Sequence, residues 1–457
     1  MTTATSSSPA AGANPRLQAM LQAPVAATLI RLSWPNMLMM LAQSSTGLIE
    51  TWFLAKLGTE VLAGVAVVVP VLMLMQNMSQ GAMGGGISSA IARALGAGRR
   101  DDANHLVRHA VALNAGIGLV FTVLLLLFGR QLYHLLGADG PALDAATDYG
   151  HVVFAGLTLM WMMNALASAI RGTGNMLVPG AVICGGAVLL IPLSPCLIFG
   201  LGPLPPLGVV GGAWALVVYY GAGTLILGAY CLSGRNPARL VRGGLQWRMM
   251  RGILTVGGFA CLNPVLTNAI IAVTGALVGA YGGTAALAGY ATAARLEYLL
   301  MPLAFGLGAP MVAMVGSNIG AGQPERARHI AMAGGAMAFA LAEVVGLLAA
   351  TFPYAWLRLF GTDAHLLEAG AAYLRLVGPF YGFFAMGFSL YFASQGAGKL
   401  KWPLTAGGLR LFLYVGVGGA VLAATGSLTA FYILGAIAMV TYGLVVLWSV
   451  AARTWFR

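Results

Sequence analysis

Long, continuous apolar stretches dominate this sequence of 457 residues. Hydrophobic residues make up 59% of the chain and charged residues 8%, whereas a soluble globular protein carries about 25% charged residues. Most of the stretches exceed the roughly 20 residues that a helix needs to span a bilayer. A membrane span must be a helix or part of a closed barrel, and the stretches lack the alternating pattern of barrel strands. The sequence therefore predicts an all-α integral membrane protein.

Twelve transmembrane helices are expected, six in each half of the chain. The first six are predicted near residues 31–55, 61–92, 104–128, 148–170, 177–201 and 209–232. The second six are predicted near residues 253–281, 285–318, 327–352, 369–394, 403–424 and 428–451. Each half is thus long enough to form a lobe of six helices.

The two halves repeat each other at an offset of 224 residues. Gly-Ala-Gly at 96–98 recurs at 320–322, and the same offset relates other pairs, among them Tyr149 and Tyr373. A period of this length is too long for a solenoid and indicates a duplicated multi-helix half. Because each half has an even number of helices, both copies enter the membrane in the same orientation. We therefore expect two six-helix lobes related by a parallel pseudo-two-fold repeat.

This organisation divides the chain into four segments. Residues 1–24 are rich in Thr, Ser, Ala, Pro and Gly and are expected to form a disordered cytoplasmic tail. The N-terminal lobe is expected over residues 25–232 and the C-terminal lobe over residues 253–457. Residues 233–252 are basic and Gly-rich, and they are expected to link the lobes across the cytoplasmic face.

Positive charge concentrates at one set of helix ends. The net charge of the chain is +12. The basic residues at these ends are Arg93, Arg99, Arg100, Arg108, Arg171, Arg235, Arg239, Arg242, Arg248, Arg251, Arg326, Arg328, Lys399, Lys401, Arg453 and Arg457. The opposite ends carry only Lys56, Arg130 and Arg358. The positive-inside rule then places both termini in the cytoplasm, and the Ala- and Gly-rich composition suits a multi-pass protein of a bacterial inner membrane. No basic face interleaved with aromatic residues is found, so a nucleic-acid partner is not expected.

Neither a metal centre nor an enzyme active site is indicated. The four cysteines have irregular spacings in or near the apolar stretches, and no pair of histidines has ligand spacing inside a predicted span. No catalytic dyad or phosphate-binding arrangement is found within the spans. We expect a protein that is not an enzyme and that carries no cofactor and no bound metal.

Glu50 is the best candidate for a functional group inside the membrane. Asn36, Gln43 and Glu50 follow each other at intervals of seven residues, so they lie along one face of the first predicted helix. A polar stripe that faces lipid is costly, so this stripe is expected to face a cavity. Burial favours the neutral form of a carboxyl group, so Glu50 is a candidate for reversible proton uptake. The alternative is that Glu50 reaches the outer surface beside Lys56.

Other polar residues fall within the predicted spans. In the first lobe, Gln76 and Gln80 are four residues apart on the second helix, and Asn164 lies midway along the fourth. In the second lobe, Asn263 and Thr267 lie on the seventh helix. All five are expected to contribute to a polar cavity that contacts substrate.

Arg295 and Glu297 are a further pair of charged residues, on the eighth predicted helix. They lie about 200° apart around the helix axis, so they do not pair with each other. Two roles remain open for them, structural ion pairing and contact with substrate. Glu343, on the ninth helix, is a candidate partner for Arg295, although a buried ion pair adds little stability.

Four short loops and the end of the first helix resemble one transporter family. The loops are Ala-Leu-Gly-Ala-Gly at 94–98, Arg-Gly-Thr-Gly-Asn at 171–175, Met-Val-Gly-Ser-Asn-Ile-Gly-Ala-Gly at 314–322 and Gln-Gly-Ala-Gly-Lys at 395–399, and Ile-Glu-Thr at 49–51 ends the helix. These segments resemble the MATE (multidrug and toxic compound extrusion) transporters, over about residues 30–450. The loop glycines are expected to form tight turns with positive φ, or to act in closing the cytoplasmic side.

The resemblance also bears on ion coupling. Family members place an aspartate implicated in ion coupling at the position of Glu50, so this chain keeps the carboxyl group on a longer side chain. A branch that is often sodium-coupled has a glutamate midway along the seventh helix, where this chain has Asn263, Thr267 and no acid. The chain therefore resembles the DinF-like branch more closely, which implies proton coupling through the first lobe. Sodium remains the alternative coupling ion.

Together, these features predict a secondary active multidrug efflux transporter. It is expected to export organic cationic or amphipathic compounds in exchange for protons, by alternating access of its two lobes. Its expected partners are small-molecule substrates and the lipid bilayer, and it is expected to act as a monomer. Two alternatives remain open: a sodium-coupled drug antiporter, and a flippase for a lipid-linked precursor.

Overall fold

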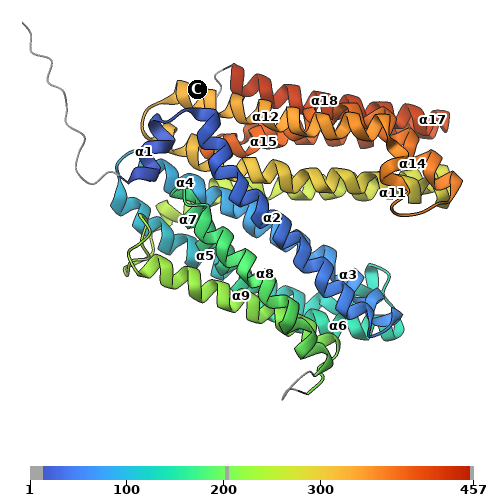
Figure 1. Ribbon diagram of the computed structural model, residues 1–457, viewed down its shortest axis with the longest axis horizontal. Coiled ribbons are helices and arrows are strands. Elements are labelled where there is room, and N and C mark those ends of the chain that lie inside the picture. Colours follow the sequence, from blue (N-terminus) through green and yellow to red (C-terminus); the bar gives the residue numbers. More distant parts are fainter. Residues whose placement is uncertain (1–13, 201–204, 453–457) are drawn as a thin grey trace, which may run out of the picture.

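The computed structural model describes residues 14–200 and 205–452, and this part of the chain is helical with no strand (Figure 1). Ten continuous helical stretches are long and apolar enough to span a bilayer, and two further helices form a span bent by 44°. The longest stretch, Trp247–Gly320, has 74 residues and a length of about 110 Å, far more than one span requires. Gly283, with φ of 76°, breaks it into two spans. The described residues therefore form twelve spans, as the sequence predicts.

The first half of the chain contains nine membrane-embedded segments. They are α2 (Val25–Ala55), α3 (Thr59–Gln76), the π-helix η1 (Asn77–Met83), α4 (Gly84–Gly96), α5 (Arg100–Leu135), α6 (Gly140–Ala155), α7 (Leu157–Gly172), α8 (Leu177–Phe199) and α9 (Val209–Leu232). Segments α3, η1 and α4 make up one span, and α6 and α7 are the bent span. The predicted end of the fifth span, residue 201, lies outside the described residues.

The second half follows the same plan. Its segments are α10 (Trp247–Ala260), α11 (Leu262–Gly320), α12 (Pro324–Thr351), the short α13 (Pro353–Leu357), α14 (Ala364–Val377), the 3-10 turn η2 (Gly378–Phe380), α15 (Tyr381–Ala397), α16 (Lys401–Leu411), the π-helix η3 (Phe412–Val417), α17 (Gly418–Thr425) and α18 (Leu428–Ala451). The predicted cytoplasmic Arg453 and Arg457 lie outside the described residues. The break at Gly283 separates the seventh and eighth spans within α11.

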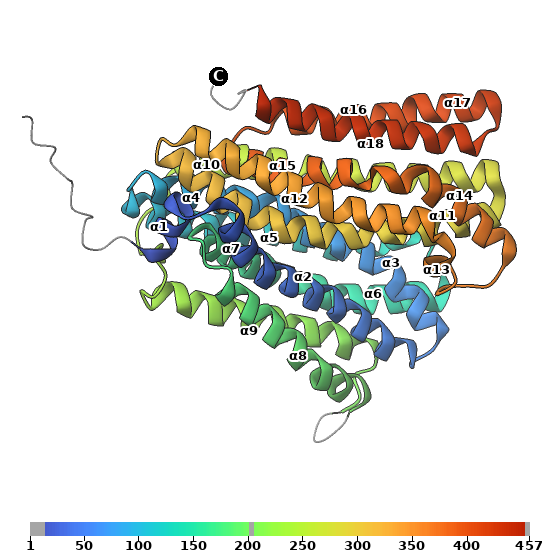
Figure 2. The same cartoon turned by 45° about the horizontal axis from the view of Figure 1, so that its top comes forward.

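Two helix bundles result, one from each half of the chain (Figures 1 and 2). Each bundle has its own large hydrophobic core, built almost entirely from residues of its own half. Between the bundles, η1, α4 and α2 contact α10, α11 and α15. The contacts of α4 with α11 and α15 lie toward the end of the molecule where α1 is found, at the left of Figure 1. The repeat in the sequence is therefore a repeat of whole lobes.

The repeated glycines perform two different tasks. Gly98 and Gly322 follow α4 and α11 with φ of 73° and 72°, which favours glycine and fits the predicted turns. Gly96 and Gly320 instead end those helices in helical conformation. A Cβ atom on Gly96 would strike the carbonyl oxygen of Ser317 across the lobe boundary. Their role is thus close packing between lobes, which a turn alone would not require.

The segment preceding the first span differs from expectation. Residues 1–24 are predicted as a disordered tail, but Pro15–Gln22 form the helix α1, with Asn14 accepting a hydrogen bond from the Arg16 backbone at its start. Met20 is 1% exposed and fills space beside Gly174, while its carbonyl oxygen accepts a hydrogen bond from Asn318. The prediction failed because polar composition says nothing about a short helix that is held by tertiary contacts. Residues 1–13 of the predicted tail lie outside the described residues.

Candidate functional site

Glu50 lies inside the first lobe, near the end of α2, and its side chain is 5% exposed. Its Oε1 accepts a hydrogen bond of 2.8 Å from the hydroxyl of Tyr149 on α6. A Cβ atom on Gly212 of α9 would lie 3.2 Å from the same oxygen, so the absence of a side chain there makes room for the carboxyl group. The carboxyl group is therefore enclosed by three helices of one lobe.

Lys56 does not neutralise Glu50. Its ammonium group lies 3.7 Å from the centre of the Trp52 ring, and none of the ion pairs among the described residues includes Glu50. The alternative that Glu50 reaches the surface beside Lys56 is thus wrong. A buried carboxyl group without a cationic partner is costly when ionised. Its protonation state therefore depends on whether a cation is bound beside it.

The predicted stripe on α2 does not face one continuous cavity. Asn36 is 1% exposed and donates hydrogen bonds of 3.2 Å to the carbonyl oxygens of Phe305 and Gly306 in the second lobe. Gln43 is half-buried. Residues on one helix face thus meet different neighbours, because α2 passes from the lobe boundary into the first lobe. Asn36 joins the lobes, and Glu50 belongs to the interior of one of them.

The remaining polar residues of the first lobe cluster around the π-helix η1. Gln76 donates a hydrogen bond of 2.9 Å to Gln80, and the Gln80 amide lies 3.9 Å from the sulfur of Met40 on α2. Asn164 is fully buried and donates to the hydroxyl of Ser79 at 3.2 Å. No hydrogen bond among the described residues links this cluster to Glu50. The predicted polar patch exists, but it is separate from the carboxyl group.

The acidic residues of the second lobe have unexpected partners. Glu297 accepts a hydrogen bond from the hydroxyl of Tyr373 on α14. Arg295 is exposed, and its guanidinium lies 5.0 Å from the centre of the Phe360 ring. Glu343 accepts a hydrogen bond of 2.9 Å from the backbone N–H of Gly382 at the start of α15, where a carboxylate is favourable. The suggested pairing of Arg295 with Glu343 is therefore wrong, and Arg295 does not join the other candidates.

Asn263 and Thr267 do line a cavity. It is lined by residues of α11, α15, α16 and α18 of the second lobe. Its wall also includes Arg410, which is 6% exposed and lies with its guanidinium 4.5 Å from the centre of the Phe384 ring. Asn263 and Thr267 of the seventh span, which carries no acid, therefore share a cavity with a buried cation.

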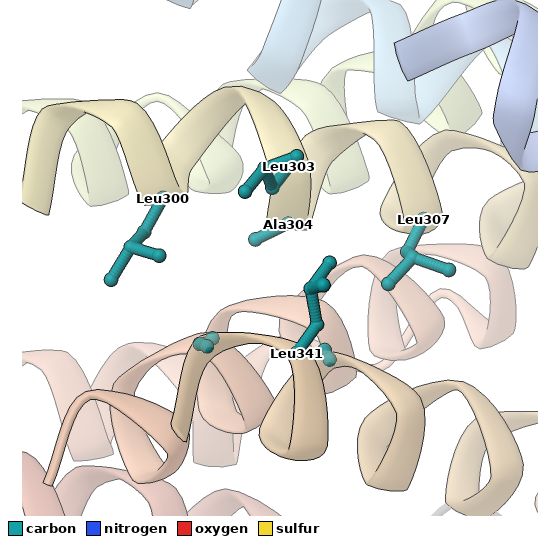
Figure 3. Close-up of a pocket in the computed structure, with 8 residues that line it drawn as sticks. Leu300, Leu303, Ala304, Leu307 and Leu341 are labelled. Carbon is teal, nitrogen blue, oxygen red and sulfur yellow. The ribbon is translucent and has the colours of Figure 1, made fainter. Parts of the chain in front are cut away.

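A second cavity has no polar lining. It lies between α11, α12 and α15, where Leu341 points toward Leu303 and Leu307 (Figure 3). Its walls consist of leucine and alanine side chains. Such a cavity can receive an apolar group, but it offers no atom that could hold an ion or direct a charged substrate.

Tyr149, Tyr373 and Arg410 are the site residues that sequence analysis did not select. The two tyrosines were visible only as a matched pair of the 224-residue repeat, with nothing to connect either to a carboxyl group. Their hydrogen bonds to Glu50 and Glu297 become evident once the helices are packed. The available signal was that Tyr149 and Tyr373 are identical at equivalent positions of the repeat, where most apolar residues differ.

The geometry can now be compared with known proteins. The MatE family model matches residues 35–196 and 260–418, one stretch in each lobe, which together cover most of the chain. The chain belongs to the MATE family. It is therefore a multi-pass membrane transporter and not an enzyme.

Two curated MATE relatives and one solved structure show how closely this chain follows the family. The "FAD transporter" of Shewanella oneidensis is 27% identical over 380 residues, covering 82% of each chain. The "Probable multidrug resistance protein NorM" of Thermotoga maritima is 27% identical over 387 residues, covering 82% of this chain and 81% of that protein. A MOP superfamily transporter from Pyrococcus furiosus has the same fold, with a TM-score of 0.88 at 23% identity over 97% of this chain and 98% of that one.

Proposed function

We propose that this MATE protein exports organic compounds, cationic or amphipathic, in exchange for protons, and that Glu50 is the coupling group. The observation that carries the proposal is the burial of Glu50 in the first lobe with Tyr149 as its hydrogen-bond donor and no cationic partner. A proton that enters from outside neutralises the carboxyl group. The change in charge alters its hold on Tyr149 and on a cationic substrate, and the substrate leaves.

The arrangement of the lobes supports an alternating-access cycle. With both termini in the cytoplasm, as the charge distribution predicts, the contacts between the lobes lie on the cytoplasmic side. They include Asn36 with Gly306, and Ser89 with the carbonyl oxygen of Gln395 at 2.5 Å. This conformation is closed toward the cytoplasm and suits proton entry from outside. Opening toward the cytoplasm requires these contacts to break while each lobe keeps its own core.

Proton coupling is preferred to sodium coupling because of the second lobe. A cation site there would need acidic ligands, but the cavity beside Asn263 and Thr267 carries the guanidinium of Arg410 instead. Glu297, the enclosed carboxyl group of that lobe, accepts a hydrogen bond from Tyr373 and lies near the charge of Arg410. Among the described residues Glu50 has no such cation nearby, so Glu50 is the preferred coupling group. A flippase is less favoured, since no observation on the described residues points to a lipid-linked substrate.

The cargo class draws on the names of the relatives. The Thermotoga maritima protein is named a multidrug resistance protein, which supports organic drugs as cargo. The Shewanella oneidensis relative is named a FAD transporter, and FAD is an anionic dinucleotide. An anionic aromatic compound is therefore a second candidate cargo, and the buried Arg410 is the observation that favours it.

The test is substrate efflux from proteoliposomes under an imposed pH gradient or an imposed sodium gradient. We expect efflux to follow the pH gradient in the wild type and to fall to the rate of empty liposomes in Glu50→Gln. Glu343→Gln is the matched control, because Gln can still accept the hydrogen bond from the Gly382 backbone. Efflux driven by sodium alone, or unchanged efflux in Glu50→Gln, would show that Glu50 does not couple protons to transport.

A further inference from the structure

Arg410 is a buried cation for which the described residues supply no hydrogen-bond acceptor. Its side chain is 6% exposed, and its Nε is enclosed without an acceptor. Among the described residues no ion pair includes it, and its guanidinium lies against the face of Phe384. Leaving a buried charged donor without an acceptor is costly, so we expect this arginine to have an acceptor that comes from outside the protein.

The other buried or half-buried arginines near the lobe boundary do have protein partners. Arg93 donates to the hydroxyl of Ser89 and to the carbonyl oxygen of Gly396. Arg171 donates to the hydroxyl of Ser168 at 2.9 Å, at the C-terminal end of α7 where a cation is favourable. Arg410 has neither an acceptor nor such a helix end, because α16 continues directly into η3.

The surroundings of Arg410 have the composition of a binding site for an anionic aromatic compound. The guanidinium lines the cavity together with the amide of Asn263 and the hydroxyl of Thr267. Both groups can donate hydrogen bonds to oxygen. The wall is otherwise aromatic, with Phe384, Phe388 and Tyr442. A planar guanidinium binds carboxylate or phosphate oxygens with two parallel hydrogen bonds, and the rings can stack on an aromatic body.

Glu297 is an acidic group of the second lobe that could compete for this role. It lies within electrostatic range of Arg410 but not in direct contact with it. Its carboxyl group accepts the hydrogen bond of Tyr373 instead. The charge of Glu297 therefore moderates the cost of burying Arg410 without occupying the guanidinium, whose donors remain available to a ligand.

We propose that the cavity of the second lobe binds the anionic group, carboxylate or phosphate, of an aromatic compound. Arg410 pairs with the charge, and Asn263 and Thr267 donate to the remaining oxygens. The proposal builds on the proposed export function, because the ligand would be cargo. Dye binding to this site is measured without an ion gradient, whereas proton coupling through Glu50 is measured as efflux under a gradient. The two proposals can therefore fail independently.

Two dyes that share a ring system and differ in charge provide the test. Carboxyfluorescein is an anionic xanthene and rhodamine 6G a cationic one, and fluorescence polarisation reports the binding of each to the detergent-purified protein. We expect Arg410→Gln to weaken carboxyfluorescein binding about ten-fold or more, the usual effect of losing a charged hydrogen-bond donor, and to leave rhodamine 6G binding unchanged. Arg295→Gln is the matched control, since that arginine is exposed and is not among the residues that line the cavity.

An anionic lipid headgroup has the same chemistry as a soluble anion, so a competitor separates the two sources. Displacement of carboxyfluorescein by dihexanoyl phosphatidylglycerol, at concentrations where dihexanoyl phosphatidylcholine has no effect, assigns the site to a headgroup. Absence of displacement assigns it to soluble compounds. Both results support an anion site at Arg410, provided that the dye binding depends on that residue.

Three results would overturn the proposal. The first is an equal loss of affinity for both dyes in Arg410→Gln, and the second is the same loss in Arg295→Gln. The third concerns the double variant Arg410→Gln with Glu297→Gln. If it regains the stability and the carboxyfluorescein binding that Arg410→Gln alone has lost, then Arg410 serves as a counter-ion of Glu297. If Arg410→Gln does not fold, Arg410→Lys replaces it. It keeps the charge but loses the two-pronged geometry, so it is expected to bind carboxyfluorescein more weakly than the wild type and rhodamine 6G equally well.

Discussion

At the level of single residues, each lobe buries one carboxyl group against one tyrosine. Tyr149 and Tyr373 occupy equivalent positions of the repeat, and they donate to Glu50 and Glu297. The two glutamates are not equivalent, because the position that matches Glu50 in the second half is Thr274, which is fully buried. The duplicated tyrosines thus meet acids that come from different helices, α2 in one lobe and α11 in the other.

Replacing Tyr149 with Phe tests whether the hydrogen bond to Glu50 takes part in coupling. A hydrogen bond to a charged acceptor contributes about 1.5–3 kcal/mol, and its loss leaves the ionised carboxyl group less stabilised. We therefore expect proton-driven efflux from proteoliposomes to slow markedly in Tyr149→Phe. Tyr373→Phe removes the equivalent bond in the other lobe and is expected to stay close to the wild type. Equal losses in both variants would argue against coupling through the first lobe alone.

At the level of helices, equivalent spans of the two halves are irregular at equivalent places. In one half the irregularity is a π-helix, and in the other it is a proline. The π-helix η1 corresponds under the 224-residue offset to residues 301–307, which contain Pro302 within α11. The π-helix η3 corresponds in the same way to residues 188–193, which contain Pro192 within α8. Both a π-helix and a proline interrupt the regular hydrogen bonding of a helix. Equivalent spans therefore have a weak point at equivalent places in both lobes.

Helix α1 is held by tertiary contacts with both lobes. Leu17 packs against the hydrophobic cores of both halves, and Arg326 donates to the carbonyl oxygen of Ala23 just beyond the helix. A helix of eight residues is not stable on its own in water. Its presence therefore depends on the closed arrangement of the lobes around it.

Truncation of Met20 to alanine is expected to release α1 locally. Large-to-small substitutions of buried side chains cost about 2–5 kcal/mol, and a peripheral helix can open without global unfolding. Hydrogen–deuterium exchange of residues 15–22 should accelerate about ten-fold or more, while exchange in α5 stays unchanged. Met332→Ala, which alters an exposed methionine of α12, is the control. Unchanged exchange at residues 15–22 would show that Met20 does not anchor the helix.

At the level of the whole molecule, the lobes meet through a symmetric pair of contacts. Gly96 packs against the carbonyl oxygen of Ser317, and Gly320 packs against that of Arg93. These residues are exchanged by the same offset of 224, so each contact is the image of the other. The motif that marks the repeat in the sequence therefore lies where the two copies touch.

Gly96→Ala is expected to separate the lobes at this end. The added Cβ atom would strike the Ser317 carbonyl oxygen, and overpacking costs about 1–3 kcal/mol. A change of one or two kcal/mol alters the ratio of two conformations about 5- to 30-fold. Pulsed EPR distances between spin labels at Asp101→Cys and Glu325→Cys, in a variant without native cysteines, should shift toward longer values.

Gly116→Ala is the control for that experiment. Gly116 also lies within a helix, but a Cβ atom there meets nothing within 4 Å. Both substitutions add the same helix propensity, so a difference between them reports the lobe contact. Identical distance distributions in the two variants would contradict a role for Gly96 in holding the lobes together.

Helix number, the approximate positions of the spans and the duplication followed from the sequence, because each depends on local composition. A helix that spans a bilayer must satisfy its backbone internally and be apolar over its length, so the predicted span 209–232 coincides with α9. The sequence also identified Glu50, since an acid is rare and costly at that depth. Helix α1 escaped prediction because its stability comes from neighbours more than 150 residues away, such as Asn318.

The partners of the charged residues depended on how the helices pack. Asn36, Gln43 and Glu50 share a helix face, yet that face crosses from the lobe boundary to a lobe interior, which no periodicity records. Arg295 and Arg410 are both arginines within predicted spans, but one is exposed and the other enclosed. The hydrogen bond of Glu50 and the burial of Arg410 both depend on segments that are distant in the chain. Only the packing of the two lobes brought Tyr149 to Glu50 and Arg410 to its cavity.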